Sequence, residues 1–434
     1  MNAQMNEHRN DPKWYKLDNA AKIYPAARSR SWAAMFRVSA TLTEPVDPDC
    51  LAQALRRTAA RFPGFSLRLR PGLFWYYLEK VDDIPPVEQD VANPCASIRL
   101  RENGGLMYRV RYHDNRVALE VFHVLTDGTG GMTFLRTLVA EYLTLRYGAD
   151  IPRSAGILDC TKPPAAGELE DSFAKYARSE TLKRGEAAAY RPRGTSIDRN
   201  LISIVTGILP AGAVRAKAKA CGVSVTEYLT SALIMAVYDV EQNEISARRR
   251  RMPVKVCVPV NLRKFYGSST LRNFSSFVNP GIDPRFGRYT FAEVLRQVKS
   301  FMGLETSEKM MNARMSTNVV TERNAFLRAT PLFLKNPTMR LAFRLNGDRT
   351  SSTTISNLGS VALPPAMAQY VTRLDFMLGT LKYNPVACAV VSYNDTMCIN
   401  FTRAITEAGI ERGFFTFLVK QGIPVKIESN RSYD

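Results

Sequence analysis

Histidine is scarce in this chain, and one of its three histidines lies where it could do chemistry. His8 belongs to a polar N-terminal stretch and His113 to a predicted turn, whereas His123 ends a stretch in which apolar residues alternate. This alternation predicts a strand with His123 on its apolar face, where a pocket could tune the imidazole. An imidazole that titrates near neutral pH can take a proton from a nucleophile and return one to a leaving group. His123 is therefore the candidate general base.

The residues after His123 form the segment His123-Val-Leu-Thr-Asp127-Gly128 and continue into a glycine-rich turn at 128–131. Glycines accept unusual backbone angles, which favours a tight turn into the helix that follows. The spacing alone leaves two interpretations open. His123 could be a buried histidine at a strand end, with Asp127 as N-cap of the next helix. Alternatively, His123 is a base and Asp127 anchors its loop through an ion pair. Arg263 is a candidate partner for that pair or an ordinary surface arginine.

Other catalytic signatures are missing from the sequence. It contains no Gly-x-Ser-x-Gly nucleophile elbow, no Gly-x-x-x-x-Gly-Lys phosphate loop and no His-Glu-x-x-His helix. Its seven cysteines are widely spread and include no Cys-x-x-Cys pair. We therefore expect neither a metal site nor a disulfide framework.

The elements that must position His123 are predicted to mix α and β structure in both halves of the chain. In the first half the patterns predict a strand at 36–42, a helix at 48–61, strands at 65–69 and 74–77, a hairpin of 106–112 with 117–123, and a helix from 128 that closes at Gly148. In the second half they predict a capped helix from Ser224, strands at 254–260 and 353–356, a hairpin of 387–392 with 397–402, and a helix at 410–421.

The length of 434 residues, with 45% hydrophobic and 23% charged residues, is typical of a globular protein of two domains. We expect an N-terminal lobe at 1–165, a partly helical crossover at 166–200 and a C-terminal lobe at 201–434. No apolar run is long enough to span a bilayer or to form a signal core, so the sequence favours a cytoplasmic protein without a transmembrane segment.

The formal net charge of +19 suggests an acidic partner. A phosphate-bearing cofactor, an acidic carrier protein, nucleic acid and an anionic membrane surface all fit this charge, and the total does not choose among them. The densest basic run, 248–251, is typical of a solvated loop. No zinc-finger spacing and no heptads behind a basic region accompany it, which disfavours nucleic acid.

The motif His123-x-x-x-Asp127-Gly128 resembles the active-site signature of the coenzyme-A-dependent acyltransferase superfamily. This superfamily includes chloramphenicol acetyltransferase, alcohol acetyltransferases and peptide-synthetase condensation domains. Two later segments add to the resemblance. Residues 259–263 are similar to the family's strand that carries the arginine paired to the motif aspartate, and residues 355–359 are similar to its Ser-Asn-x-Gly segment. The likeness is greatest to the alcohol acetyltransferase-like branch and the polyketide-associated acyltransferases.

The resemblance implies an α/β fold of two chloramphenicol-acetyltransferase-like sandwich lobes, with a channel between them and His123 at its middle. It implies that Asp127, Gly128 and Arg263 support the site. It also implies that Asn357 and Ser356 lie near the tunnel, where Asn357 could hydrogen-bond near a tetrahedral oxyanion. Asn357 has a second interpretation, as a residue that tolerates a tight turn beside Gly359.

The implied activity is transfer of an acyl group from acyl-coenzyme A, as a co-substrate, to a small alcohol or amine, with no bound cofactor. Three alternatives stay open: an acidic acyl carrier protein as donor, hydrolysis of the thioester, and a non-catalytic binding module that retains the fold. Condensation domains carry a second histidine just before the catalytic one, where this chain has Phe122. This departure disfavours a role in forming peptide bonds.

Overall fold

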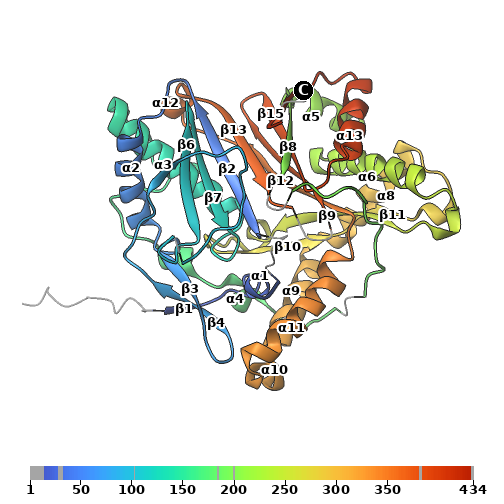
Figure 1. The fold of residues 1–434 in the computed structure, drawn as a ribbon, viewed down its shortest axis with the longest axis horizontal. Helices are drawn as coiled ribbons and strands as arrows, with labels where there is room; N and C mark the ends of the chain where they lie inside the picture. Colours follow the sequence, from blue (N-terminus) through green and yellow to red (C-terminus); the bar gives the residue numbers. More distant parts are fainter. Residues whose placement is uncertain are drawn as a thin grey trace, which may run out of the picture.

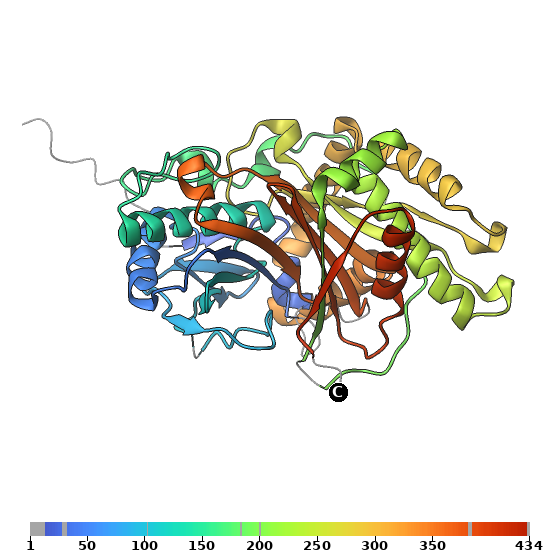
Figure 2. The same cartoon turned by 90° about the horizontal axis from the view of Figure 1, so that it is seen from above.

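The computed structural model describes residues 14–27, 33–101, 103–182, 185–198, 201–380 and 384–431, so His8 lies outside the described residues. Two lobes lie side by side (Figures 1 and 2), and each has its own cluster of buried apolar side chains. Both lobes mix helices with sheet, and the predicted two-lobed α/β fold is confirmed.

The N-terminal lobe contains a five-stranded sheet in the order β13-β2-β7-β6-β5 and a three-stranded sheet in the order β1-β4-β3. Helices α2 and α3 pack on each other, and α3 also packs on β2 and β7. The bounds are β1 (Trp14–Lys16), α1 (Ile23–Ala27), β2 (Met35–Leu42), α2 (Pro48–Arg61), β3 (Leu67–Pro71), β4 (Tyr76–Lys80), β5 (Val87–Gln89), β6 (Tyr108–His113), β7 (Arg116–Phe122) and α3 (Gly128–Tyr147).

The C-terminal lobe is built on an eight-stranded sheet in the order β10-β9-β12-β14-β15-β8-β16, with β11 paired to β9. Helix α6 packs against α8, α13 and β9. The bounds are β8 (Ser203–Pro210), α5 (Ala211–Ala220), α6 (Val225–Glu244), η2 (Arg248–Arg250), β9 (Val254–Asn261), α7 (Arg263–Tyr266), β10 (Ser275–Val278), β11 (Gly281–Ile282), η3 (Pro284–Phe286), α8 (Phe291–Glu305), β12 (Thr353–Val361), β14 (Val386–Tyr393), β15 (Thr396–Arg403), α13 (Gly409–Lys420) and β16 (Lys426–Ser429).

Between the lobes run η1 (Ala166–Leu169) and α4 (Ser172–Tyr176), at the start of the expected crossover. A helical segment that the sequence patterns did not reveal follows α8. It consists of α9 (Glu308–Arg323), α10 (Ala325–Ala329), α11 (Leu332–Phe343) and the π-helical turn η4 (Arg344–Asp348). Helix α11 packs on α1.

One strand joins the sheet of the opposite lobe. The predicted ranges place residues 371–378 in the C-terminal lobe, whereas β13 (Val371–Leu378), preceded by α12 (Pro365–Ala368), pairs antiparallel with β2 of the N-terminal sheet. Leu374 and Phe376 of β13 are buried in the apolar cluster of the N-terminal lobe, and this burial favours the exchange. The chain therefore crosses between the lobes more than once.

Both predicted hairpins are present, as β6–β7 and β14–β15, and each turn contains a residue with a left-handed backbone, Asp114 and Asn394. Asn and Asp accept this conformation more readily than other non-glycine residues. Among the described residues no single helix has both the length and the apolar composition to cross a bilayer, although α5 and α6, bent by 87°, meet that test as a pair.

Candidate active site around His123

His123 is the first residue after β7, at the point where the chain turns towards α3. Its backbone N–H donates to the carbonyl of Ala34 (2.9 Å). The imidazole is partly buried between two aromatic rings: Tyr24 of α1 stacks on it at a centroid distance of 4.7 Å, and Phe36 of β2 meets it edge-on at 5.3 Å. Burial lowers the pKa of His123, and the opposing effects of Asp127 and of hydrogen bonding do not restore it. The imidazole is therefore neutral at neutral pH.

Asn273, in the loop before β10, fixes the tautomer of this imidazole. Its Nδ2 donates to the backbone carbonyl of His123 (3.0 Å) and faces Asp18 Oδ2 (3.3 Å), so its Oδ1 is the atom that lies 2.9 Å from His123 Nδ1. An amide oxygen only accepts, so Nδ1 must carry the proton and Nε2 keeps its lone pair. This is the protonation state that a general base requires. The sequence patterns did not reveal Asn273.

Asp18 lies behind Asn273 as a third member of this chain of contacts. Its carboxylate is fully buried, accepts from the backbone N–H of Ala21 (2.7 Å) and lies 3.6 Å from Arg272 Nε. Burial raises the pKa of Asp18 to about 6, although Arg272 opposes the shift. Asp18 and Tyr24 both belong to the N-terminal segment before α2. This segment therefore supplies the ring that stacks on His123, from Tyr24, and the carboxylate that contacts Asn273, from Asp18.

Both interpretations of Asp127 describe contacts that are present. Oδ1 accepts from the backbone N–H groups of Thr129 (3.1 Å) and Gly130 (3.2 Å), which makes Asp127 the N-cap of α3. Oδ2 accepts from Arg263 Nη1 (2.7 Å) and from the backbone N–H of Phe274 (3.0 Å). One carboxylate therefore joins the start of α3 in the N-terminal lobe to the C-terminal lobe.

The predicted ion pair of Asp127 with Arg263 is thus confirmed, although a single Arg263 nitrogen makes it. The other guanidinium nitrogens donate to backbone carbonyls, Nε to Thr270 (2.8 Å) and Nη2 to Arg272 (2.5 Å). Arg263 therefore also orders the loop 267–274, which carries Asn273. Arg263 thus acts on the histidine in two ways: it binds Asp127 in the histidine loop, and it orders the loop that carries Asn273.

The glycines after Asp127 are required by close packing, whereas the sequence predicted a need for unusual backbone angles. Gly128 and Gly131 belong to α3 and have no positive φ. A Cβ on Gly128 would lie 2.7 Å from Leu358 Cδ2, and one on Gly131 would lie 2.6 Å from Phe36 Cε2. The prediction named the right residues for the wrong reason. The contact of Gly128 with Leu358 also places the segment 355–359 against the first turn of α3.

Asn357 makes the local contacts of its turn interpretation. Its Oδ1 accepts from the backbone N–H of Gly359 (2.8 Å), which has a positive φ of 79°, and its Nδ2 donates to Thr226 Oγ1 (3.1 Å) in the first turn of α6. The register of β12 with β14 shifts between Asn357 and Ser360. None of the described hydrogen bonds joins Asn357 or Ser356 to His123, so their place at an oxyanion stays a prediction.

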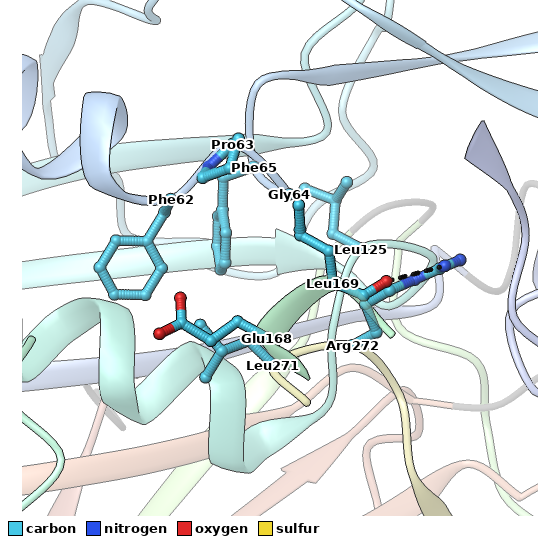
Figure 3. Close-up of a pocket in the computed structure, with 9 residues that line it drawn as sticks. All are labelled: Phe62, Pro63, Gly64, Phe65, Leu125, Glu168, Leu169, Leu271 and Arg272. Carbon is cyan, nitrogen blue, oxygen red and sulfur yellow. Dashed lines mark hydrogen bonds between the residues drawn. The ribbon is translucent and has the colours of Figure 1, made fainter. Parts of the chain in front are cut away.

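A small pocket is lined in part by Leu125, from the segment between His123 and α3 (Figure 3). Its volume of about 20 Å³ has room for about one water molecule. The pocket is lined by Phe62, Pro63, Gly64, Phe65, Leu125, Glu168, Leu169, Leu271 and Arg272. It is therefore a packing defect beside the site and too small for an acyl chain.

A wider and open depression of about 500 Å³ lies where α5 meets α6. It is lined by Arg215, Ala218, Lys219, Gly222, Val223, Ser224, Val225 and Glu227. Thr226, the hydrogen-bond partner of Asn357, lies between two of these residues in sequence. The depression therefore borders the β12 irregularity. Elsewhere in the described ranges, no group of three or more His, Cys, Asp or Glu side chains has a metal-binding arrangement.

Comparison with known proteins gave matches at the level of structure alone. No family model and no curated protein sequence matches this chain. The first condensation domain of the calcium-dependent antibiotic synthetase superposes with a TM-score of 0.63 at 16% identity, over 93% of this chain and 96% of that one. TRI101 of F. graminearum, solved with coenzyme A and T-2 mycotoxin, gives 0.61 at 12% identity, over 96% and 100%. The trichothecene 15-O-acetyltransferase TRI3 of Fusarium sporotrichioides gives 0.58 at 12% identity, over 94% of each chain.

These superpositions extend over nearly the whole chain. The protein therefore has the two-lobed fold that condensation domains and trichothecene acetyltransferases share, as the motif resemblance implied. His123 directly follows a strand of one lobe and is held by Asn273 of the other.

Proposed function

We propose that this protein is an acyltransferase that moves an acyl group from acyl-coenzyme A to an alcohol or amine, with His123 as general base. The observation that carries the proposal is the His123–Asn273 hydrogen bond. The bond keeps the ring proton on Nδ1, and burial lowers the pKa of the ring, so the Nε2 lone pair is available at the junction of two lobes of this fold.

In the proposed reaction, Nε2 of His123 takes the proton from the acceptor's hydroxyl or amine as its oxygen or nitrogen attacks the thioester carbonyl. The resulting tetrahedral intermediate collapses with cleavage of the carbon–sulfur bond. The thiolate leaves and takes the proton from the imidazolium, so that free coenzyme A, the ester or amide, and neutral His123 remain. No covalent enzyme intermediate is required.

The supporting roles belong to the same proposal. Asp127 and Arg263 hold the histidine loop against the C-terminal lobe, and Gly128 permits the close approach of Leu358. We place Asn357 and Ser356 on the wall of the acyl channel, since Leu358 beside them already contacts the first turn of α3. An amide N–H from Asn357 would meet the oxyanion only after exchanging its present bond to Thr226.

Coenzyme A is the proposed donor because of charge. The depression at the start of α6 contains Arg215 and Lys219 and borders the Asn357 turn, so it offers cations for the donor's phosphates. TRI101, which has the same fold, was solved with coenzyme A. An acidic carrier protein would be attracted by the same charge and is the second candidate donor.

The test is release of free thiol from a panel of acyl-coenzyme A donors with alcohols and amines, by wild type and by His123→Ala. Loss of at least ~100-fold in kcat is expected for the variant, since general-base catalysis contributes typically 10²–10⁴-fold. His113→Ala, a change in the exposed β6–β7 turn, is the matched control and should retain full activity. Undiminished turnover by His123→Ala, or thiol release by wild type that needs no acceptor, would contradict the proposal.

Arg215→Ala/Lys219→Ala distinguishes the two donors from each other. With coenzyme A as donor, the double variant should raise KM for acyl-coenzyme A and leave kcat near the wild-type value. If the wild type uses only acyl groups bound to a carrier protein, the donor is a carrier protein and the proposal of coenzyme A as donor is wrong.

A further inference from the structure

Helix α11 exposes apolar side chains to the solvent. Leu334, Leu341 and Leu345 are seven and four residues apart, so they share one face of the helix and its π-helical extension. All three are exposed, and Phe333 beside them is 72% exposed. The opposite face of the helix carries Leu332, which is buried. A helix of a globular protein normally buries its apolar stripe, whereas the described part of the chain leaves this second stripe uncovered.

The tip of the β3–β4 hairpin lies beside the N-terminal end of α11, on the face of the helix that carries Leu332 and Lys335. Leu73, at the tip, is 69% exposed, and its carbonyl accepts from the backbone N–H of Leu332 (2.8 Å). Lys335 secures the same tip, because its Nζ donates to the carbonyl of Phe74 (2.8 Å) and lies 3.5 Å from the centre of the Trp75 ring. The hairpin tip is therefore attached to the N-terminal end of α11, where it adds exposed apolar side chains of its own.

Helix α10 adds the most exposed apolar side chain of this region, Phe326 at 84%. We call the whole surface the apolar ridge. Its members are Leu73, Phe74, Phe326, Phe333, Leu334, Leu341 and Leu345. Figure 1 shows that α10 and the β3–β4 tip project together at the lower edge of the molecule. The ridge thus lies on a protruding part of the molecule.

The charges along α10 and α11 are all of one sign. Residues 323–345 contain five basic residues and no acidic one, and the four arginines among them, Arg323, Arg328, Arg340 and Arg344, are exposed. Basic side chains beside protruding Phe and Leu are the composition of segments that lie in the headgroup region of a bilayer. Anionic lipid headgroups complement the positive charge, and the acyl chains below them accept the apolar side chains.

We propose that the apolar ridge docks the protein on the surface of a membrane that contains anionic lipids. A bilayer fits better than an acidic protein, because a protruding apolar surface enters a fluid interface without a matching groove. The docked edge lies close to the candidate active site. Helix α11 packs on α1, where Arg340 Nε donates to the carbonyl of Ala26 (2.6 Å), and α1 carries Tyr24, which stacks on His123. The ridge does not depend on the proposed chemistry, and its test requires no activity.

The test is flotation of the full chain with vesicles of phosphatidylcholine alone and with ~30% phosphatidylglycerol. Wild type should float with the anionic vesicles and detach as salt is raised. Phe326→Ser/Phe333→Ser/Leu341→Ser should weaken binding at least ~10-fold. The matched control is Phe286→Ser/Leu304→Ser, which removes side chains of 79% and 67% exposure outside the ridge and should bind as wild type does.

A Phe326→Trp variant keeps the proposal testable if the serine variant does not fold. Its added tryptophan emission should shift to the blue with anionic vesicles and not with phosphatidylcholine alone. Absence of wild-type flotation, equal flotation of the ridge variant, or an unshifted Phe326→Trp would overturn the proposal. So would a wild type that is dimeric by light scattering and becomes monomeric in the ridge variant, since the ridge would then be a contact between two copies of this chain.

Discussion

Asn273 contacts both the ring and the backbone of His123: its Oδ1 accepts from Nδ1, and its Nδ2 donates to the histidine's own carbonyl. The two residues are 150 positions apart and belong to different lobes. One side chain thereby sets the tautomer of the ring and the path of the backbone that carries it.

Replacing Asn273 by alanine should lower kcat about 10- to 100-fold and change KM little, because the ring loses the acceptor that keeps the proton on Nδ1. The measurement is steady-state thiol release across pH. Asn279→Ala, a change at another buried asparagine of the same lobe that bonds to Glu186 and Thr350, is the control. A drop of equal size in the control would show that Asn273 acts through general stability.

The activity should persist to a lower pH than an exposed histidine would allow. Burial lowers the pKa of His123, so the imidazole stays neutral, and able to accept a proton, below its usual pKa of about 6.5. The acid limb of kcat/KM against pH should therefore lie below about pH 6.5. A limb above pH 7 would contradict the assignment of His123 as the titrating base.

Asp18 should make the stability of the protein depend on pH. Its folded-state pKa of about 6 lies above the ordinary value of 3.8, so the folded state favours the protonated form. The stability from this group is full below about pH 4 and is lost as pH rises through about 6. The free energy of unfolding of Asp18→Asn should therefore rise relative to that of wild type by on the order of 2 kcal/mol as the pH is raised from 4 to 7.

Urea denaturation at several pH values measures this difference for Asp18→Asn. Asp82→Asn, a change at an exposed carboxyl between β4 and β5 for which no ion pair is described, is the control, and its difference from wild type should not vary with pH in that window. A constant difference for Asp18→Asn would show that Asp18 is charged in the folded protein throughout the window.

The two functions of Asp127 should separate in variants. Asp127→Asn keeps an oxygen that can cap α3 and loses the ion pair, whereas Asp127→Ala loses both. We expect Asp127→Asn to cost about 1–3 kcal/mol of unfolding free energy and Asp127→Ala about 1 kcal/mol more. In urea denaturation, equal costs for the two variants would mean that the cap contributes nothing.

A methyl group on Gly131 should disturb the site through Phe36, the ring that borders His123. The new Cβ would lie 2.6 Å from Phe36 Cε2, so the ring must move, at a cost of about 1–3 kcal/mol and with a loss of activity. Gly303→Ala in α8 is the matched control. No atom lies within 4 Å of its new Cβ, so it should stabilise by about 0.5–1 kcal/mol. Thermal unfolding and kcat distinguish the two variants, and a fully active Gly131→Ala would show that Phe36 does not position the histidine.

The sequence predicted those parts of the site that have a local signal. The hairpin that delivers His123, helix α2 and the capped start of α6 at Ser224 each depend on neighbours in the chain. The Asp127–Arg263 pair was predicted because both residues belong to a recognisable motif. Asn273, Asp18 and Tyr24 could not be predicted, because their contacts join distant segments and follow no periodicity. The bond from Asn273 to Asp18, for example, links positions 255 residues apart.

The strand exchange and the helical segment α9–α11 could not be predicted from the sequence for a related reason. No sequence pattern predicted the strand at 371–378, and only burial in the opposite lobe shows which sheet it joins. In α11 the apolar residues lie on both faces, so the sequence has no single amphipathic stripe that would predict a surface helix.

The residues around His123 come from both ends of the connection between α4 and β8. The histidine, Tyr24 and Asp18 precede it, whereas Asn273, Arg263 and the strand β13 follow it. A cut in this connection therefore yields two fragments, neither of which contains both His123 and the Asn273 that contacts it. If mixing the fragments restores turnover, the rate is proportional to the number of reassembled molecules. Activity then measures directly how the two lobes recognise each other.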